Sequence, residues 1–188
     1  MKRALLLGDY REALDDRRVD ALVLGTPDHW HALPTIHACQ ANKDVYVEKP
    51  DGHNIVEGRT MVAAAKKYGR VIQLGTQNRS GQSQRACMEY IRAGKLGKVR
   101  FAKAWESSRQ GNIGFPPDSD PPPGVDYDMW LGPAPERPFN PNRFHFNFRW
   151  FWDYAGGLMT DWGVHLLNVC LWAMGPQIPQ RVSSSGGK

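Results

Sequence analysis

Three short apolar runs, separated by amphipathic segments, constrain the fold of this chain more than any other feature. The runs lie at residues 21–25, 44–48 and 71–75. Helices are expected between them, at residues 31–41 and 54–68. Strands that alternate with helices form a parallel sheet, because each crossover helix returns the chain to the same end of the sheet. The first part of the chain is therefore predicted to be α/β.

The second of these helices has a signal at each end. Asn54 stands before its first turn, where a short polar side chain can accept the free backbone amides. Gly69 stands after its last turn, where a left-handed backbone is often required. The helix is therefore expected to end at about Tyr68.

The pattern changes near residue 80, and we predict a first domain at residues 1–80 and a second at 81–188. The second domain is expected to begin with a helix that ends near Ala93, followed by a strand at residues 99–106. A long segment rich in proline and glycine follows, at residues 109–142. Its length exceeds that of a typical connection, so it is either a functional loop or a region that lacks part of its support.

Composition excludes several classes of protein. The net charge is +5, but the basic residues are scattered, so a phosphate-bearing cofactor explains the charge as well as nucleic acid does. The three cysteines form no CxxC pair, which argues against a disulfide framework and a thiolate metal site. No apolar run reaches the ~20 residues needed to cross a bilayer. We therefore expect neither nucleic acid nor a membrane as partner, and a cytoplasmic location by default.

Polar residues follow all three predicted strands. Residues 26–31 follow the first strand, and residues 76–79 follow the third. The second strand ends in Glu48, Lys49 and Pro50. Each segment alone could be an ordinary turn, but ligands of open parallel sheets bind just beyond the carboxyl ends of the strands. Three such segments at one edge favour a ligand site.

Lys49 is the most informative single residue in these segments. A lysine directly after an apolar strand can reach a bound ligand with its ammonium group, and Pro50 fixes the direction of the chain after it. The alternative is a surface ion pair at a strand end, worth less than about 1 kcal/mol, with no functional role.

A second pair of chemical groups lies in the segment 156–165, on a helix expected at residues 157–173. Asp161 and His165 are four residues apart, so both side chains project from one face. Positive partial charge at the helix start favours ionised Asp161 and disfavours protonated His165, so a neutral imidazole could take a proton from a substrate hydroxyl. The alternative is a first-turn aspartate beside a half-buried histidine without a catalytic role.

Aromatic and polar residues are interleaved in the segment 143–154. Such rings can stack on bases, pack against sugar rings or fill a core, and the nearby Asp161 and His165 favour the sugar. Three histidines lie near the first strand, but no carboxylate or cysteine stands at a zinc spacing from them, so no metal is expected.

With these residues in place, the chain resembles the family of glucose-fructose oxidoreductase, inositol dehydrogenase and rhizopine-catabolism proteins (Gfo/Idh/MocA). The similarity extends over nearly the whole chain, from about Asp9 to Gly175. The matching segments are Gly25 to His31, Glu48 to Pro50, Gly75 to Arg79, and Gly156-Gly157 through Asp161 to His165. The combination of Glu-Lys-Pro with the later helix is the specific part of this signature.

The resemblance implies a partial Rossmann-type parallel sheet for NAD or NADP, followed by the start of an α+β domain with an antiparallel sheet. It implies hydride transfer between a sugar or polyol carbon and nicotinamide, with Lys49, Asp161 and His165 as catalytic residues. The residues implied to line the cofactor are Thr26, Pro27, His29, His31, Glu48, Lys49, Gln77, Asn78, Arg149 and Trp150. Those implied to contact the substrate are Lys49, Tyr154, Asp161 and His165.

The chain also departs from the family pattern. Residues 1–10 lack the G-x-G-x-x-G turn whose amides would hold the pyrophosphate, and the acidic residue for the ribose is missing. We therefore expect a fragment truncated at both ends, from a homo-oligomeric parent that could carry an export signal to the periplasm. Two alternatives stay open: an NAD-dependent glycoside hydrolase of the same family, and a catalytically inactive fragment.

Overall fold

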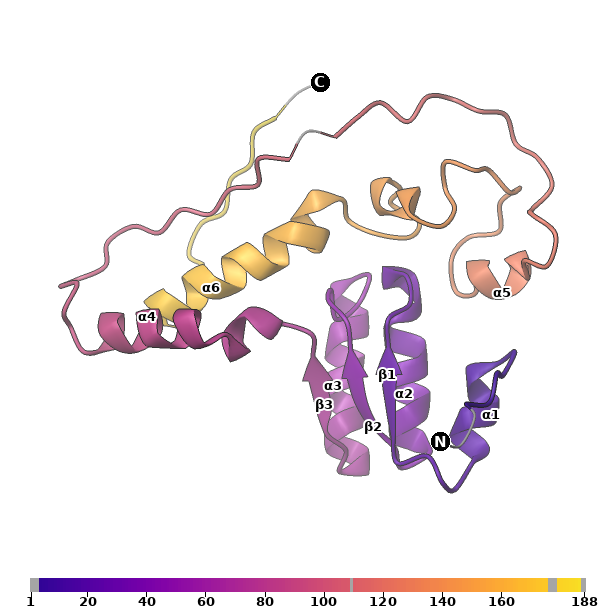
Figure 1. Ribbon diagram of the computed structural model, residues 1–188, viewed down its shortest axis with the longest axis horizontal. Coiled ribbons are helices and arrows are strands. Elements are labelled where there is room, and N and C mark those ends of the chain that lie inside the picture. Colours follow the sequence, from indigo (N-terminus) through magenta and orange to yellow (C-terminus); the bar gives the residue numbers. More distant parts are fainter. Residues whose placement is uncertain (1–3, 109, 176–178, 187–188) are drawn as a thin grey trace.

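The computed structural model describes residues 4–108, 110–175 and 179–186. It contains a three-stranded parallel sheet in the order β1-β2-β3 (Figure 1). The strands are β1 (Ala21–Leu24), β2 (Asp44–Val47) and β3 (Ile72–Leu74). Each crossover is a helix, α2 (Ala32–Gln40) or α3 (Ile55–Tyr68). The register places Leu22 opposite Val45 and Val45 opposite Ile72. The predicted α/β class is confirmed.

The core of this part lies between the sheet and its two helices, which cover the same face (Figure 1). Leu22, Leu24, Val45 and Val47 point into the core, where burial of each side chain contributes roughly 1.5–3 kcal/mol. The opposite face of β1 is open, and Val23 on that face is 80% exposed. The run at residues 21–25 is therefore buried on one face only, because α2 and α3 both pack on that face.

Helix α3 has the two ends that its sequence predicts. Asn54 accepts a hydrogen bond from the backbone amide of Glu57 at 3.0 Å, and its own amide donates to the Glu57 carboxylate at 3.0 Å. Gly69 ends the helix in the left-handed conformation, with φ of 61°. Both local predictions are confirmed.

A short helix that was not predicted, α1 (Tyr10–Asp15), lies beside α2 (Figure 1). Asp9 caps it by accepting from the backbone amide of Arg11 at 2.8 Å. The Tyr10 hydroxyl and the Nδ1 atom of His37 on α2 share a hydrogen bond of 2.7 Å. This contact joins α1 to α2.

The rest of the chain consists of short helices and long loops. They are the 3-10 turn η2 (Gln77–Ser80), α4 (Gln82–Arg92), α5 (Tyr127–Leu131), the 3-10 turn η3 (Asn147–Trp150), the π-helical turn η4 (Met159–Gly163) and α6 (Val164–Met174). The strand expected at residues 99–106 is wrong: among the described residues no strand pairs with this segment. A strand needs a neighbour for its backbone groups, and its own sequence cannot supply one.

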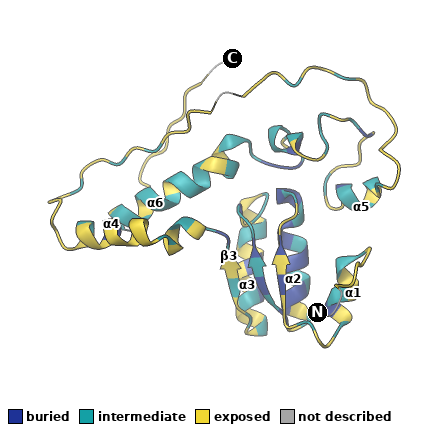
Figure 2. Ribbon diagram, viewed as in Figure 1, coloured by how far each residue is buried: buried dark blue, intermediate teal, exposed yellow. Residues whose placement is uncertain are grey.

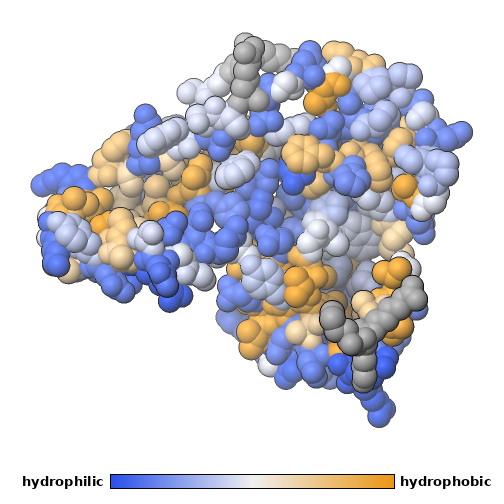
Figure 3. Space-filling model, viewed as in Figure 1, coloured by the Kyte–Doolittle hydropathy of each residue, from blue (hydrophilic) through white to orange (hydrophobic). Residues whose placement is uncertain are grey.

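Two packing features distinguish this second part. A small core forms around Leu131, Phe148, Tyr154 and Ala155. By contrast, no residue of the apolar helix α6 is buried (Figure 2). Apolar side chains reach the surface over α4 and α6 (Figure 3). No helix of the described chain is long and apolar enough to cross a membrane.

Candidate active site

Lys49 and Asp161, which are 112 residues apart, meet beyond the carboxyl end of β2. The Lys49 ammonium donates to the Asp161 carboxylate, and also to the Asp161 backbone oxygen at 2.8 Å. Arg149 donates from Nε to the second carboxylate oxygen of Asp161 at 3.0 Å. The side chains of Lys49 and Asp161 are each 16% exposed. One carboxylate therefore joins two cations in a shielded place.

The two cations keep Asp161 ionised. Burial alone would raise the pKa of its carboxyl group, but the hydrogen bonds and charges of Lys49 and Arg149 lower this pKa below its usual range. Asp161 therefore holds both cations in position as a carboxylate at neutral pH.

His165 is the second residue of α6, which directly follows the π-helical turn η4 that contains Asp161. Burial and the nearby Lys49 charge lower the pKa of His165 below its ordinary value, which favours the neutral imidazole at pH 7. The direction agrees with the sequence-based expectation, although burial rather than the helix start is the main cause. Its Nδ1 atom is buried and has no hydrogen-bond partner among the described residues.

These groups border a cavity of about 340 Å³, which we call the lysine cavity. Its lining consists of Lys49, Gln77, Asn78, Phe146, Arg149, Asp161, Trp162, His165 and Leu166. The structure thus brings Gln77 and Asn78, from the end of β3, to the same place as Lys49 from the end of β2. Phe146, Trp162 and Leu166 were not predicted. Phe146 falls within the aromatic segment 143–154, but no periodicity in that segment distinguishes it from its neighbours.

A second cavity, of about 450 Å³, lies beyond the end of β1, and we call it the threonine cavity. It is lined by Gly25, Thr26, Pro27, Trp130, Phe144, His145, Phe146, Phe148 and Arg149. Thr26 and Pro27, which the sequence predicts to contact a ligand, therefore border a cavity. Phe146 and Arg149 line both cavities, so the two lie side by side along the carboxyl edge of the sheet.

His31 and Glu48 support this edge but line neither cavity. The ring nitrogens of the buried His31 lie 2.5 Å from the Pro50 backbone oxygen and 2.8 Å from that of Thr26. The Glu48 carboxylate accepts a hydrogen bond from the Lys49 backbone amide at 3.3 Å. In this structure both residues hold the strand-end loops and do not reach into the cavities.

Three further predicted site residues lie elsewhere. Tyr154 is fully buried, and its ring packs against the rings of Trp130 and His29. Burial raises the pKa of Tyr154 to about 12, and its hydroxyl has no partner in the described part of the chain. Trp150 lines a separate cavity of about 350 Å³. The structure therefore does not bring His29, Trp150 or Tyr154 to the lysine cavity; His29 and Tyr154 are core residues because aromatic rings enclose them.

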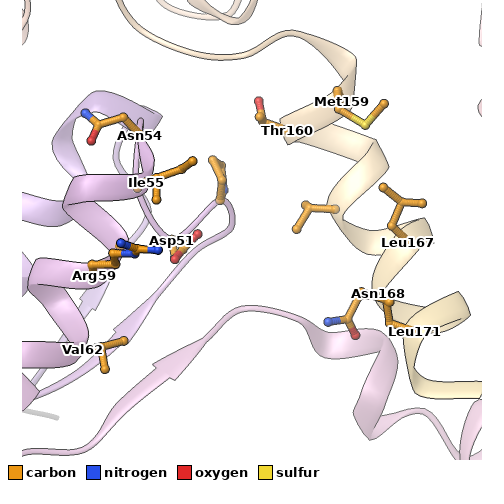
Figure 4. A pocket seen from close by; sticks show the side chains of 14 residues that line it. Asp51, Asn54, Ile55, Arg59, Val62, Met159, Thr160, Leu167, Asn168 and Leu171 are labelled. Carbon is orange, nitrogen blue, oxygen red and sulfur yellow. The ribbon is translucent and has the colours of Figure 1, made fainter. Parts of the chain in front are cut away.

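A wider groove, of about 780 Å³, lies between α3 and α6, on the far side of the segments that contain Lys49 and Asp161 (Figure 4). Pro50 and Thr160 line this groove, whereas their chain neighbours Lys49 and Asp161 line the lysine cavity. Most of the groove lining is apolar, with Ile55, Val62, Met159, Leu167 and Leu171 among its residues. Asp51, Asn54, Arg59 and Asn168 add polar groups to the groove. The cluster of Lys49, Asp161 and His165 lies in the lysine cavity, on the side that faces the ends of the strands.

The donor set of the two cavities fits the nicotinamide end of a dinucleotide. The side-chain amides of Gln77 and Asn78 line the lysine cavity together with the Lys49 ammonium and the His165 imidazole, and the Thr26 side chain lines the adjoining threonine cavity. No glycine-rich turn precedes a helix at the start of the described chain, so a holder for the pyrophosphate is not among these residues. Likewise, no group of three His, Cys, Asp or Glu side chains in the described ranges could hold a metal ion.

Comparisons with curated proteins show enzymes among the relatives. A trans-1,2-dihydrobenzene-1,2-diol dehydrogenase from Bos taurus is 25% identical over 179 residues, which are 95% of this chain and 44% of the relative. A scyllo-inositol 2-dehydrogenase (NAD(+)) from Bacillus subtilis is 24% identical over 90% of this chain and 40% of the relative. The chain therefore spans less than half the length of these relatives.

Among solved structures, the chain is similar to the WlbA dehydrogenase from Bordetella pertussis in complex with NADH and UDP-GlcNAcA. The TM-score is 0.62 at 20% identity, over 90% of this chain and 41% of that one, which supports the fold alone.

Two family models match consecutive parts of the chain. Residues 4–76 match the oxidoreductase family, NAD-binding Rossmann fold, and residues 98–183 match the C-terminal alpha/beta domain of the same family. Together these segments cover most of the sequence. They confirm the expected family, the Rossmann character of the sheet and a nicotinamide dinucleotide as the cofactor class. The chain belongs to the Gfo/Idh/MocA oxidoreductase family.

Proposed function

We propose that the protein transfers hydride between a hydroxyl-bearing carbon of a sugar or polyol and a nicotinamide cofactor. The observation that carries the proposal is the meeting of Lys49, Asp161, Arg149 and His165 at the carboxyl edge of the sheet. The names of the two curated relatives, a diol dehydrogenase and an inositol dehydrogenase, support the same class of substrate.

Lys49 is proposed to orient the reacting hydroxyl. Its ammonium has three N–H donors, and the carboxylate and backbone oxygen of Asp161 use two of them. The third donor is available to a substrate oxygen in the lysine cavity. Asp161 and Arg149 act as positioning residues, because together they fix the Lys49 side chain without touching the reacting carbon.

His165 is proposed to carry the proton. Its lowered pKa favours the neutral imidazole at pH 7, so the ring can accept the hydroxyl proton in oxidation and return it in reduction. A bound nicotinamide supplies the acceptor for the hydride from the same carbon. Thr26 and Pro27 at the end of β1, with Gln77 and Asn78 after β3, would hold that end of the cofactor.

The test is steady-state oxidation of myo-inositol or glucose with NAD⁺ or NADP⁺ by Lys49→Ala and His165→Asn variants of the intact protein. Loss of an acid–base group lowers turnover by about 10²- to 10⁴-fold, so His165→Asn should reduce kcat by that order. Lys49→Ala should abolish measurable turnover.

The matched control is Lys66→Ala, which removes an exposed lysine near the end of α3. It should leave kcat and KM unchanged. Cofactor binding, measured by calorimetry, should weaken much less than kcat in the His165 variant. Full activity in Lys49→Ala would refute the assignment.

A further inference from the structure

We propose that Phe146 gives the site a preference for cyclic substrates, because its ring forms a flat apolar surface against which the C–H face of a sugar or cyclitol ring packs. This inference rests on the proposed function, since it defines the substrate class of the same site. It concerns specificity and not the chemical step, so the two proposals can fail separately.

The position of Phe146 is the first support for this role. Phe146 lines the lysine cavity together with Lys49 and His165, and it lines the threonine cavity together with Thr26 and Pro27. Its side chain is 61% exposed, although the small core around Phe148 lies two residues away in the chain. An aromatic ring that is left open where two cavities meet is available to a ligand.

The ring is also held in place. The Arg149 guanidinium carbon lies 4.4 Å from the centroid of the Phe146 ring and 4.8 Å from that of Phe148, and Nη1 of Arg149 donates to the Phe146 backbone oxygen at 3.0 Å. The same arginine donates to Asp161, which holds Lys49. A single side chain therefore fixes the position of the Phe146 ring relative to the proposed hydroxyl-binding ammonium.

The backbone just before Phe146 is turned in an unusual way. His145 has φ of 58°, a left-handed conformation that residues other than glycine rarely adopt. Such outliers persist where the surrounding structure holds them, and they occur often at binding sites. Here the turn accompanies the exposure of Phe146, between the buried Phe148 and the partly buried Phe144.

Two rings could pack on Phe146, the nicotinamide ring of the cofactor and the ring of a cyclic substrate, and their charges differ. Oxidised nicotinamide is a cation, and the cation of Arg149 already stacks on the Phe146 ring. A second cation there would be repelled, whereas a neutral polyhydroxylated ring would not. The C–H groups on one face of a six-membered ring form a flat apolar patch that matches an aromatic face, and an acyclic polyol has no such fixed face.

The test compares myo-inositol, a cyclic probe, with sorbitol, an acyclic one, in Phe146→Ala, Phe146→Tyr and Phe146→Leu variants of the intact protein. Phe146→Ala should raise KM for myo-inositol by about tenfold, the equivalent of ~1.4 kcal/mol, and change KM for sorbitol by less than about twofold. Phe146→Tyr should retain the preference, because it keeps the flat ring. Phe146→Leu should lose most of it, although it keeps apolar bulk.

Two further measurements separate this role from a structural one. The dissociation constant of myo-inositol in the presence of NADH, measured by calorimetry, should rise with KM in Phe146→Ala, while kcat and NADH affinity stay within about threefold. The control Phe101→Ala removes a phenylalanine that is 77% exposed and lines neither cavity, and it should change none of these values.

Three outcomes would overturn the inference. An equal rise in KM for myo-inositol and for sorbitol would show that Phe146 does not distinguish cyclic from acyclic substrates. A matching loss of NADH affinity would assign the ring to the cofactor. A native protein that binds and oxidises sorbitol better than myo-inositol would contradict it directly, with the proposed function intact. Only failure to bind or oxidise any polyol would overturn both proposals together.

Discussion

Protonation of His29 is expected to destabilise the folded chain in mildly acidic solution. Its side chain is 3% exposed and lies between the rings of Trp130 and Tyr154, at 5.4 Å and 5.2 Å between centroids. The Nε2 atom is 3.0 Å from the Trp130 backbone oxygen, to which a neutral ring can donate. Burial lowers the pKa of His29 from 6.5 to about 4.

The sign and size of the effect follow from linkage. An unfolded chain binds a proton at His29 near pH 6.5, but the folded chain binds it only near pH 4. Unfolding therefore takes up a proton between these values, and the stability contribution is lost as pH falls through them. At ~1.4 kcal/mol per pH unit, the loss between about pH 7 and pH 4.5 is about 2 kcal/mol. That is a large share of the ~5–15 kcal/mol that stabilises a typical domain.

The variant His29→Phe isolates this effect. It removes the titrating group, and the Trp130 backbone oxygen keeps its hydrogen bond from Trp30 Nε1 at 2.9 Å. Urea unfolding, followed by tryptophan fluorescence at both pH values, should show that the native chain loses about 2 kcal/mol more than His29→Phe. The reasoning would be refuted if the two chains lost equal stability.

Three further predictions concern the α3 caps, the charged cluster and the proposed base. Asn54→Ala and Gly69→Ala should each lower the unfolding free energy by about 1 kcal/mol, because one removes a cap and the other forces alanine to φ of 61°; unchanged urea midpoints would contradict this. Asp161→Asn should lower kcat/KM by about 10²-fold through loss of the anion that holds Lys49, a claim that near-native kinetics would reject. The pKa of His165, followed by NMR titration of the intact protein, should rise in Lys49→Met, because the lysine charge lowers it; an unchanged pKa would contradict this coupling.

Local signals predicted local structure well. The bounds of α3 follow from Asn54 and Gly69, because a cap and a left-handed glycine act within one turn of the helix. The exposure of Val23 could not be predicted, since it depends on what covers the second face of the sheet. The absence of a strand at residues 99–106 has a similar cause, because pairing requires a neighbour far away in the sequence.

The sequence indicated which residues belong to the candidate site, but it indicated few of the contacts between their side chains. Sequence patterns identified Lys49, Asp161 and His165 as chemical groups, and the structure places all three at one cavity. The role of Arg149 as the link between Asp161 and the Phe146 ring depends on side-chain packing, which no spacing rule describes. For the same reason Tyr154 was expected at the substrate but lies in the core, since an aromatic residue next to a motif can serve either purpose.

Transfer of deuterium tests the central claim most directly. The intact protein would be incubated with NAD⁺ or NADP⁺ and a cyclic polyol labelled with deuterium at its hydroxyl-bearing carbons. If Lys49 and His165 serve hydride transfer at the lysine cavity, the reduced nicotinamide should carry the deuterium, and Lys49→Ala should form none. Unlabelled reduced nicotinamide, or labelled product formed at the native rate by Lys49→Ala, would contradict the proposed function.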